Sequence, residues 1–231
     1  MDIMLGIDIG GTKIRAVLWD SKRAVKAREF KTPKNLAAFK KLLENILKSY
    51  RAKKIGIGVP GAVSGNKILF CPNIKYLKNF DISQLRRPTS KLRLDNDARC
   101  FARAHQNLPT GKAGLTHLDG QAVLFITLGT GIGRAISRAG KILKIKKFEY
   151  PESLEKEYQK LRDSKNNYAL AIFLVQHLKW RFKEYNPKLI IVGGGVTGRQ
   201  NFVAEFQKAV KLPVRKSKFG KNAAAIGAAL L

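Results

Sequence analysis

Three short glycine clusters, each placed directly after an apolar run typical of a β-strand, constrain the fold of this 231-residue chain more than any other feature. They are Gly10-Gly11-Thr12-Lys13 after LGIDI, Gly129-Thr130-Gly131 after AVLFITL, and Gly193-Gly194-Gly195 after KLIIV. Because glycine lacks a Cβ and tolerates positive φ, backbone amides in such a turn can approach the oxygens of a phosphate. One cluster alone is equally explained by a tight turn between strands. Three clusters spread over one chain indicate a nucleotide held between two halves.

A carboxylate just before the first cluster extends this interpretation. Asp8 lies where it can hold a magnesium ion through water, while Thr12 and Lys13 face the phosphates. The spacing GxxxxGK[ST] is absent, which excludes a P-loop protein. The second cluster continues into the apolar segment AIS, which predicts a hairpin rather than the helix that a dinucleotide-binding fingerprint requires.

Hydrophobic periodicity predicts strands and helices in both halves of the chain. The first 30 residues predict three strands, and one face of the helix that follows carries Leu36, Phe39, Leu42, Leu43, Ile46 and Leu47. Further strands are predicted at 54–59, 92–96, 121–127, 132–138 and 188–192. Further helices are predicted at 97–105, at 151–185 with a break near 165–167, after Gly198 and at the Ala-rich end. The turn-rich segment 109–120 marks a domain boundary.

Four stretches resemble motifs of the ROK sugar kinases, a family of the actin-like ATPase superfamily. GIDIGGTKIRAVL at 6–18 is similar to the first phosphate loop, GIGVPGAV at 56–63 to the sugar-side loop, LDNDARCFARAH at 94–105 to the segment of the catalytic aspartate, and PKLIIVGGGV at 187–196 to the adenosine loop. Weaker matches lie at 68–82, 128–133 and 222–230. The likeness covers most of the chain in the family's order.

The resemblance implies an α/β protein with the two-domain actin-like ATPase fold, which is ribonuclease H-like and has a central interdomain cleft. We expect an N-terminal actin-like domain formed by residues 1–107 and 216–231, and a C-terminal one formed by 108–215. An apolar content of 45% is sufficient for such buried cores.

The family likeness also implies a function, namely ATP-dependent transfer of the γ-phosphoryl group to a hexose hydroxyl. ATP with Mg²⁺ is the expected donor, and the expected nucleotide and phosphate ligands are Asp8, Gly10, Gly11, Thr12, Lys13, Gly129, Thr130, Gly131, Gly193, Gly194 and Gly195. Such a transfer needs a carboxylate that orients the alcohol and accepts its proton, and Asp97 is the candidate. Asn96 beside it can bind a neighbouring sugar hydroxyl. Asn and Asp at this place are also what a helix N-terminus favours, and one residue can serve both purposes.

Further sugar ligands are implied by resemblance at Gly61, Asn73, Glu149 and Glu155, with Glu152 as a competitor of the two glutamates. The family's Gly-Glu-x-Gly-His stretch and its Cys-rich zinc segment are both missing, so we expect no structural zinc. The alternative for the glutamates is a charged helix N-terminus, where the helix dipole favours carboxylates. The loss of the histidine leaves the identity of the sugar open.

A net charge of +29, from 45 Lys and Arg against 16 Asp and Glu, exceeds what a sugar kinase needs. Such a field attracts nucleotides, polyphosphate or nucleic acid. A general basic bias of the proteome explains the scattered lysines better than a dedicated nucleic-acid surface does. Two alternatives to an ATP-dependent kinase therefore stay open, namely a polyphosphate-dependent glucokinase, and a non-catalytic sugar-sensing or nucleic-acid-associated protein on the same scaffold.

The remaining expectations concern compartment and assembly. Cys71 and Cys100 are neither CxxC-spaced nor part of a histidine cluster, which is typical of reduced thiols in the cytoplasm. The N-terminus carries no signal-peptide pattern, and no apolar run reaches about 18 residues, so we expect a soluble protein that contacts no membrane. The family likeness implies a homodimer.

Overall fold

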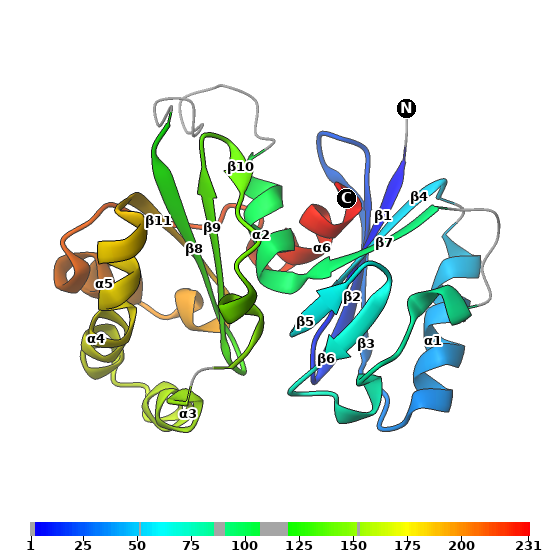
Figure 1. The fold of residues 1–231 in the computed structure, drawn as a ribbon, viewed down its shortest axis with the longest axis horizontal. Coiled ribbons are helices and arrows are strands. Elements are labelled where there is room, and N and C mark those ends of the chain that lie inside the picture. The colour runs from blue at the N-terminus through cyan, green and yellow to red at the C-terminus, as the bar shows by residue number, and fades with distance from the viewer. Residues whose placement is uncertain (1–2, 51, 86–90, 107–119, 152) are drawn as a thin grey trace. The chain divides into compact units, whose positions relative to one another are not determined.

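The computed structural model describes residues 3–50, 52–85, 91–106, 120–151 and 153–231, and these form two compact units (Figure 1). Unit 1 comprises Met1–Ala104 and Asn222–Leu231, and unit 2 comprises His105–Lys221. The expected domain boundary at 107/108 lies outside the described residues. The other expected boundary, at 215/216, lies inside unit 2, in the last strand of its sheet.

Unit 1 is built on a five-stranded sheet in the order β3-β2-β1-β4-β7. The strands are β1 (Met4–Ile9), β2 (Lys13–Trp19), β3 (Ala24–Lys31), β4 (Lys54–Val59) and β7 (Lys91–Asn96). The first three form an antiparallel meander, and β4 and β7 run parallel to β1. A hairpin of β5 (Ala62–Ser64) and β6 (Lys67–Phe70) and two short 3₁₀ helices, η1 (Lys75–Leu77) and η2 (Ile82–Gln84), follow β4.

Helix α1 (Leu36–Ser49) covers one face of this sheet, and its predicted apolar face is confirmed. Phe39, Leu43, Ile46 and Leu47 are buried in one core with Leu5 and Ile7 of β1, and Leu36 and Leu42 are partly buried against that core. The helix begins after Asn35, whose side-chain oxygen accepts a hydrogen bond of 2.9 Å from the N–H of Ala38. The amide oxygen accepts a hydrogen bond from an N–H group in the first turn, which has no acceptor within the helix.

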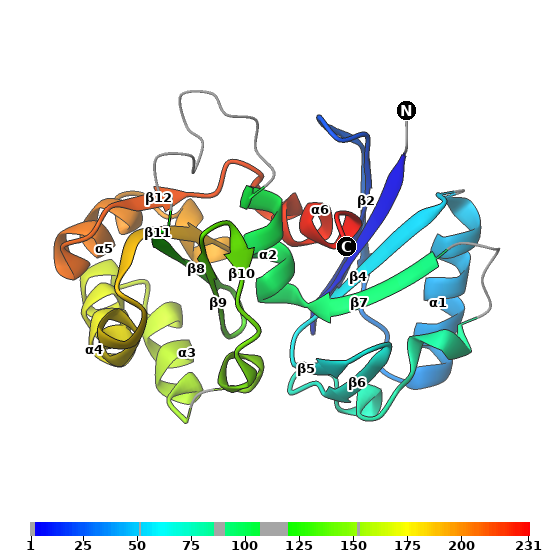
Figure 2. The same ribbon diagram turned by 45° about the horizontal axis from the view of Figure 1, so that its top comes forward.

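Helix α6 (Ala223–Ala229) lies on the opposite face of the sheet, as Figures 1 and 2 show. Side chains alternate between the faces of a strand, so Gly6 points away from the core around Leu5. A Cβ on Gly6 or on Gly56 would lie 1.7 Å from the carbonyl oxygen of Ala225 or Ala228, respectively. The two glycines therefore allow the backbone of α6 to lie directly on β1 and β4.

Unit 2 repeats the same sheet, in the order β10-β9-β8-β11-β12. Its strands are β8 (Ala122–Leu128), β9 (Ile132–Arg138), β10 (Lys141–Ile142), β11 (Pro187–Gly193) and β12 (Val214–Lys216). The first three form an antiparallel meander and β11 and β12 run parallel to β8, as in unit 1. The predicted hairpin across the second glycine cluster is confirmed, because β8 and β9 pair on either side of residues 129–131.

Three helices complete the second core, together with 3₁₀ turns η4 (Lys146–Glu149), η5 (Gly195–Gly198) and η6 (Gly220–Asn222). The helices are α3 (Glu155–Asp163), α4 (Asn167–Tyr185) and α5 (Phe202–Val210), of which α4 and α5 pack together beside the sheet (Figure 1). The predicted break in the long helical segment is confirmed at Lys165, which has a φ of 58°, and Asn166, which caps α4 through the N–H of Ala169. None of the described helices is long and apolar enough to cross a membrane.

Candidate active site

The carboxyl ends of the parallel strands in unit 1 bring together the two predicted acidic site residues. Asp8 of β1 lies opposite Gly58 of β4. A Cβ on Gly58 would lie 3.6 Å from the Cα of Asp97, the first residue of α2 (Asp97–Gln106). Because Gly58 has no side chain, the start of α2 lies close to β4 beside Asp8, and the charge of Asp97 acts on Asp8. Residues from two distant motifs therefore share one site.

The electrostatics of this site raise the pKa of both carboxyl groups above its ordinary value. Burial raises the pKa of Asp8 to about 7, and the nearby charge of Asp97 adds to this rise while Arg15 opposes it. Burial also raises the pKa of Asp97 to about 6, against a hydrogen bond from the N–H of Ala98 that lowers it. A divalent cation beside Asp8 would favour the ionised form of both carboxyl groups, and carboxylate oxygens are ligands that Mg²⁺ prefers. The predicted Mg²⁺ role of Asp8 is compatible with this chemistry.

Asn96 is the residue that caps α2. Its side-chain oxygen accepts hydrogen bonds from the N–H groups of Ala98 (3.0 Å) and Arg99 (3.2 Å), and its amide nitrogen donates to the carbonyl of Gly61 (3.0 Å). Asn96 is 3% exposed. Asp97 accepts from the same N–H of Ala98 through Oδ1 at 2.8 Å, and the N–H of Asp97 itself also bonds to this carboxylate. Asn96 thus provides most of the cap, because it also bonds to the N–H of Arg99, whereas Asp97 shares only the N–H of Ala98 with it.

A row of ion pairs, which the sequence reasoning missed, attaches α2 to β7. Asp95 lies 2.6 Å from the guanidinium of Arg99 and 3.1 Å from that of Arg103. The three residues recur at a spacing of four, so that the two arginines lie on one face of the helix. This spacing is the signal that identifies the row from sequence. These ion pairs hold α2, the helix that begins with Asp97, on the end of β7.

Hydrogen bonds to carbonyl groups hold the first glycine turn in place. The N–H of Gly10 donates to the carbonyl of Lys13 at 2.9 Å and closes the turn. Thr32, at the end of β3, donates its hydroxyl to the carbonyl of Gly10 at 2.7 Å and its N–H to the carbonyl of Thr12 at 3.0 Å. Thr32 was not predicted, because its contact with residues 10–12 follows from the register of the meander.

Two of the predicted substrate residues lie around this turn and the end of β4. A Cβ on Gly11 would lie 2.8 Å from the Cβ of Asn73, so Asn73 directly adjoins the first glycine turn. Gly61 has a φ of 137°, and a Cβ there would lie 2.0 Å from the carbonyl oxygen of Phe70. Only glycine fits such a bend. The structure thus places Gly61, Asn73, Asn96 and Asp97 in unit 1 with Asp8.

Two basic residues beside the first glycine turn form ion pairs with the same carboxylate. Glu29 of β3 pairs with Lys13 at 2.5 Å and with Arg15 through its other oxygen. Arg15 also donates to the side chain of Asn222 at 3.4 Å. Lys13 is 64% exposed in its side chain. It can therefore exchange Glu29 for a phosphate oxygen by rotation about its side-chain bonds.

The other two glycine clusters meet in unit 2. They follow β8 and β11, which are parallel neighbours, so both lie at the carboxyl edge of the sheet. Gly194 has a φ of 91°, and a Cβ there would lie 2.3 Å from the carbonyl oxygen of Leu128 at the end of β8. Ligands of open α/β sheets bind at this edge. The structure thus brings Gly129, Thr130 and Gly131 next to Gly193, Gly194 and Gly195.

The predicted glutamates also lie in unit 2. Glu155, in the first turn of α3, contacts the second glycine cluster: its Oε1 accepts from the N–H of Ile132 at 3.4 Å, and a Cβ on Gly131 would lie 2.8 Å from the same oxygen. Glu149 is 6% exposed in η4. Glu152 lies outside the described residues. In the described parts of the chain, no group of three or more His, Cys, Asp or Glu side chains could hold a metal ion.

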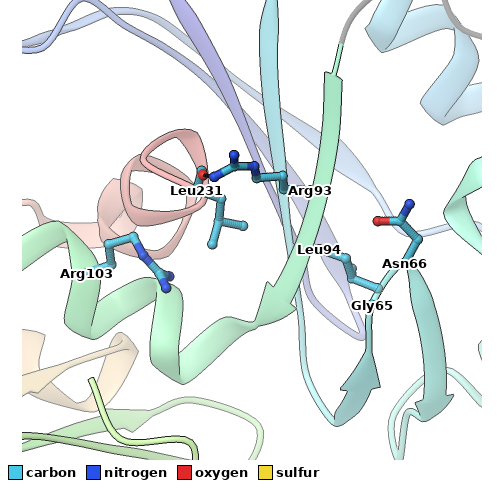
Figure 3. Close-up of a pocket in the computed structure, with 6 residues that line it drawn as sticks. All are labelled: Gly65, Asn66, Arg93, Leu94, Arg103 and Leu231. Carbon is cyan, nitrogen blue, oxygen red and sulfur yellow. Dashed lines mark hydrogen bonds between the residues drawn. The ribbon is translucent and has the colours of Figure 1, made fainter. Parts of the chain in front are cut away.

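A cavity of about 450 Å³ in unit 1 lies apart from these residues, and Figure 3 shows its lining. The lining consists of Gly65, Asn66, Arg93, Leu94, Arg103 and Leu231. Its two arginines are engaged, because Arg93 donates to the carbonyl of Leu231 and Arg103 pairs with Asp95. None of the predicted site residues lines this cavity.

Comparison with known proteins identifies the family of this chain. The ROK family profile matches residues 4–145. This chain belongs to the ROK family. A curated relative, the N-acetylgalactosamine kinase AgaK of Shewanella sp. strain ANA-3, is 31% identical over 148 residues, which are 59% of this chain and 46% of the relative. The ROK protein thus aligns with about half the length of that relative.

Two solved structures resemble the ROK protein over nearly all of both chains. A ROK family glucokinase from Streptomyces griseus, in complex with glucose and AMPPNP, has a TM-score of 0.80 at 19% identity and 98% coverage of each chain. An inorganic polyphosphate/ATP-glucomannokinase from Arthrobacter sp. strain KM has a TM-score of 0.75 at 25% identity, with 100% of this chain and 98% of the other covered. The predicted α/β actin-like ATPase fold is confirmed.

Proposed function

We propose that this ROK protein is a sugar kinase that transfers the γ-phosphoryl group of ATP to a hexose hydroxyl. The observation that carries the proposal is Asp97, a carboxylate that lies beside Asp8 at the start of α2, where Asn96 supplies most of the helix cap. Phosphoryl transfer mainly requires positioning, charge neutralisation and a base for the alcohol proton. The kinase activities named for the relatives support the same reaction class.

On the sugar side, Asp97 accepts the hydroxyl proton through its carboxylate and holds the alcohol in line with the phosphorus atom. We assign neighbouring hydroxyl contacts to Asn73 and to the second amide hydrogen of Asn96, with Gly61 holding Asn96 in place. Glu155 is a better hydroxyl acceptor than Glu149, because Glu149 is almost fully buried. Carboxylates form strong hydrogen bonds with such hydroxyls.

On the nucleotide side, residues 10–13 and 129–131 hold phosphates through backbone amides, and residues 193–195 adjoin the adenosine. Asp8 holds Mg²⁺ through water, and the ion neutralises phosphate charge when it is bound. Lys13 supplies a cation to the same phosphates. We also propose that the protein acts in the cytoplasm as a homodimer.

A second donor, inorganic polyphosphate, is favoured by the charge of the chain. The net charge is +29, and Lys13, Arg15 and Lys31 share one face of the β2–β3 pair beside the first glycine turn, with Glu29 between them. A row of cations next to a phosphate loop attracts a linear polyanion more strongly than a nucleotide. This donor is an alternative for the same sugar kinase.

The decisive experiment measures phosphoryl transfer to hexoses and N-acylated hexosamines, with MgATP and with polyphosphate in parallel at physiological salt. We expect turnover on at least one sugar, which identifies both the acceptor and the donor. If folded protein leaves every sugar unphosphorylated with both donors, the kinase proposal is wrong. A non-catalytic protein that senses sugars or associates with nucleic acid then becomes the better explanation.

The rate of this reaction is expected to fall in mild acid. Asp97 must be ionised to accept a proton, and the pKa values of Asp97 and Asp8 are about 6 and 7. Because the two groups interact, kcat/KM should show one acidic limb with an apparent pKa in this range, below which the rate falls about tenfold per pH unit. Saturating Mg²⁺ should move the limb to lower pH, because the cation competes with the proton. A kcat/KM that is flat down to about pH 5 would contradict this assignment.

A further inference from the structure

We propose that Arg162 of α3 is a positioning residue for the nucleotide phosphates, which it serves by orienting the second glycine turn. The inference rests on the proposed function, because it assumes that residues 129–131 bind phosphate. Its basis is a set of hydrogen bonds between α3 and the carbonyl groups of this turn. None of the motifs in the sequence indicates them.

Side chains of helix α3 donate hydrogen bonds to the carbonyl oxygens of the second glycine turn. Nη1 of Arg162 donates to the carbonyls of both Gly129 (3.0 Å) and Thr130 (3.1 Å). The hydroxyl of Tyr158 donates to the same carbonyl of Gly129 at 3.0 Å, and the amide of Gln159 donates to that of Thr130 at 3.2 Å. Each carbonyl therefore has two donors from the helix, and Arg162 is the residue that contacts both.

These bonds determine where the amides of the turn point. In a trans peptide the C=O and the following N–H point in opposite directions. A carbonyl of Gly129 held by α3 therefore directs the N–H of Thr130 away from the helix, and the carbonyl of Thr130 does the same for the N–H of Gly131. Within the described residues these two amides have no partner, whereas the N–H of Gly129 bonds to the carbonyl of Gly131 and that of Ile132 to Glu155. Two N–H groups of an exposed turn that both point away from α3 can bind an anion.

The guanidinium of Arg162 is itself held in place. Asp163 accepts from its Nε at 2.8 Å and from its Nη2 at 3.0 Å, which leaves Nη1 for the turn. The carbonyl of Arg162 accepts from Arg199, which directly follows η5 and the third glycine cluster. The end of α3 thus connects the two glycine turns of unit 2. Lysine, a point donor on a flexible chain, cannot make these contacts together.

The test is calorimetric binding of ADP and of adenosine to the wild-type protein and to Arg162→Ala, Arg162→Lys and Lys160→Ala. Loss of a charged donor to two carbonyls should weaken ADP binding about tenfold in Arg162→Ala. Adenosine affinity should stay unchanged, since adenosine has no phosphate. Arg162→Lys should recover only part of the loss. Lys160→Ala removes the same charge from an exposed position on the same helix and should bind ADP like the wild type.

The outcomes separate this inference from the proposed function. If the wild type binds neither ADP nor adenosine, both fail. If the wild type binds ADP and Arg162→Ala binds it equally well, or Arg162→Lys restores full affinity, the positioning role alone is wrong. Should Arg162→Ala fail to fold, Tyr158→Phe removes one bond to Gly129 and keeps the ring, and it should weaken ADP binding about threefold. An equal loss of adenosine binding would mean that α3 stabilises unit 2 in general and does not position the phosphates.

Discussion

Replacement of Asp97 by Asn is expected to lower kcat for phosphoryl transfer by about 10³-fold, the usual contribution of a positioned general base. Asparagine cannot accept the hydroxyl proton, although it keeps the size of the side chain and can accept the hydrogen bond from Ala98. The variant should remain folded because most of the cap of α2 is provided by Asn96. Turnover on the sugar identified by the panel, together with the thermal melting temperature, checks both statements.

Asp81→Asn is the matched control for this change. Asp81 also precedes a short helix in unit 1, where its carboxylate accepts from the N–H of Ser83 at 2.8 Å. The same substitution there should leave kcat unchanged. If a stable Asp97→Asn variant keeps more than about a tenth of the wild-type turnover, Asp97 is not the base.

Replacement of Gly56 by Ala is expected to lower the free energy of unfolding by about 3 kcal/mol or more. The added Cβ would lie 1.7 Å from the carbonyl oxygen of Ala228, which is backbone and cannot rotate away. Helix α6 cannot shift as a whole to make room, because Gly6 and Gly227 bring it equally close to β1 and to the carbonyl of Cys100. Urea denaturation followed by circular dichroism measures the loss.

Gly198→Ala is the control for the Gly56 prediction. Gly198 has no heavy atom within 4 Å of an added Cβ and its φ is not positive, so the change should stay within about 0.5 kcal/mol. Equal stability of both variants and the wild type would mean that α6 does not rest on β4 in this way. Activity of the Gly56 variant should fall with the fraction of folded protein.

Local sequence patterns were enough to predict the longer strands and helices, and the motifs were enough to indicate the family, whereas the short strands β5, β6, β10 and β12 were not predicted. Alternating apolar residues predict strands such as β1 and β8, and a period near 3.6 predicts the buried face of α1, because both signals arise within a few residues of each other. The hairpin across 129–131 and the break at Lys165 follow from local turn chemistry in the same way. These predictions needed no information about distant parts of the chain.

The candidate site could be predicted residue by residue but not as an arrangement. The motifs identified Asp8 and Asp97, yet their approach depends on the register of β1 against β4 and on the absence of a side chain at Gly58. The sequence also left open whether Asp97 serves as a helix cap, and in the folded chain Asn96 supplies most of the cap while Asp97 shares the N–H of Ala98.

Only the tertiary structure decided the contacts between distant segments. Thr32 on the first glycine turn and Arg162 on the second are examples, and neither residue belongs to a motif. The net charge of the chain gives no information on the position of each arginine in the fold, so it could not identify Arg162. The physical reason is that turns and periodicity are encoded by neighbours in the chain, whereas register, helix packing and side-chain hydrogen bonds depend on residues that meet only after folding.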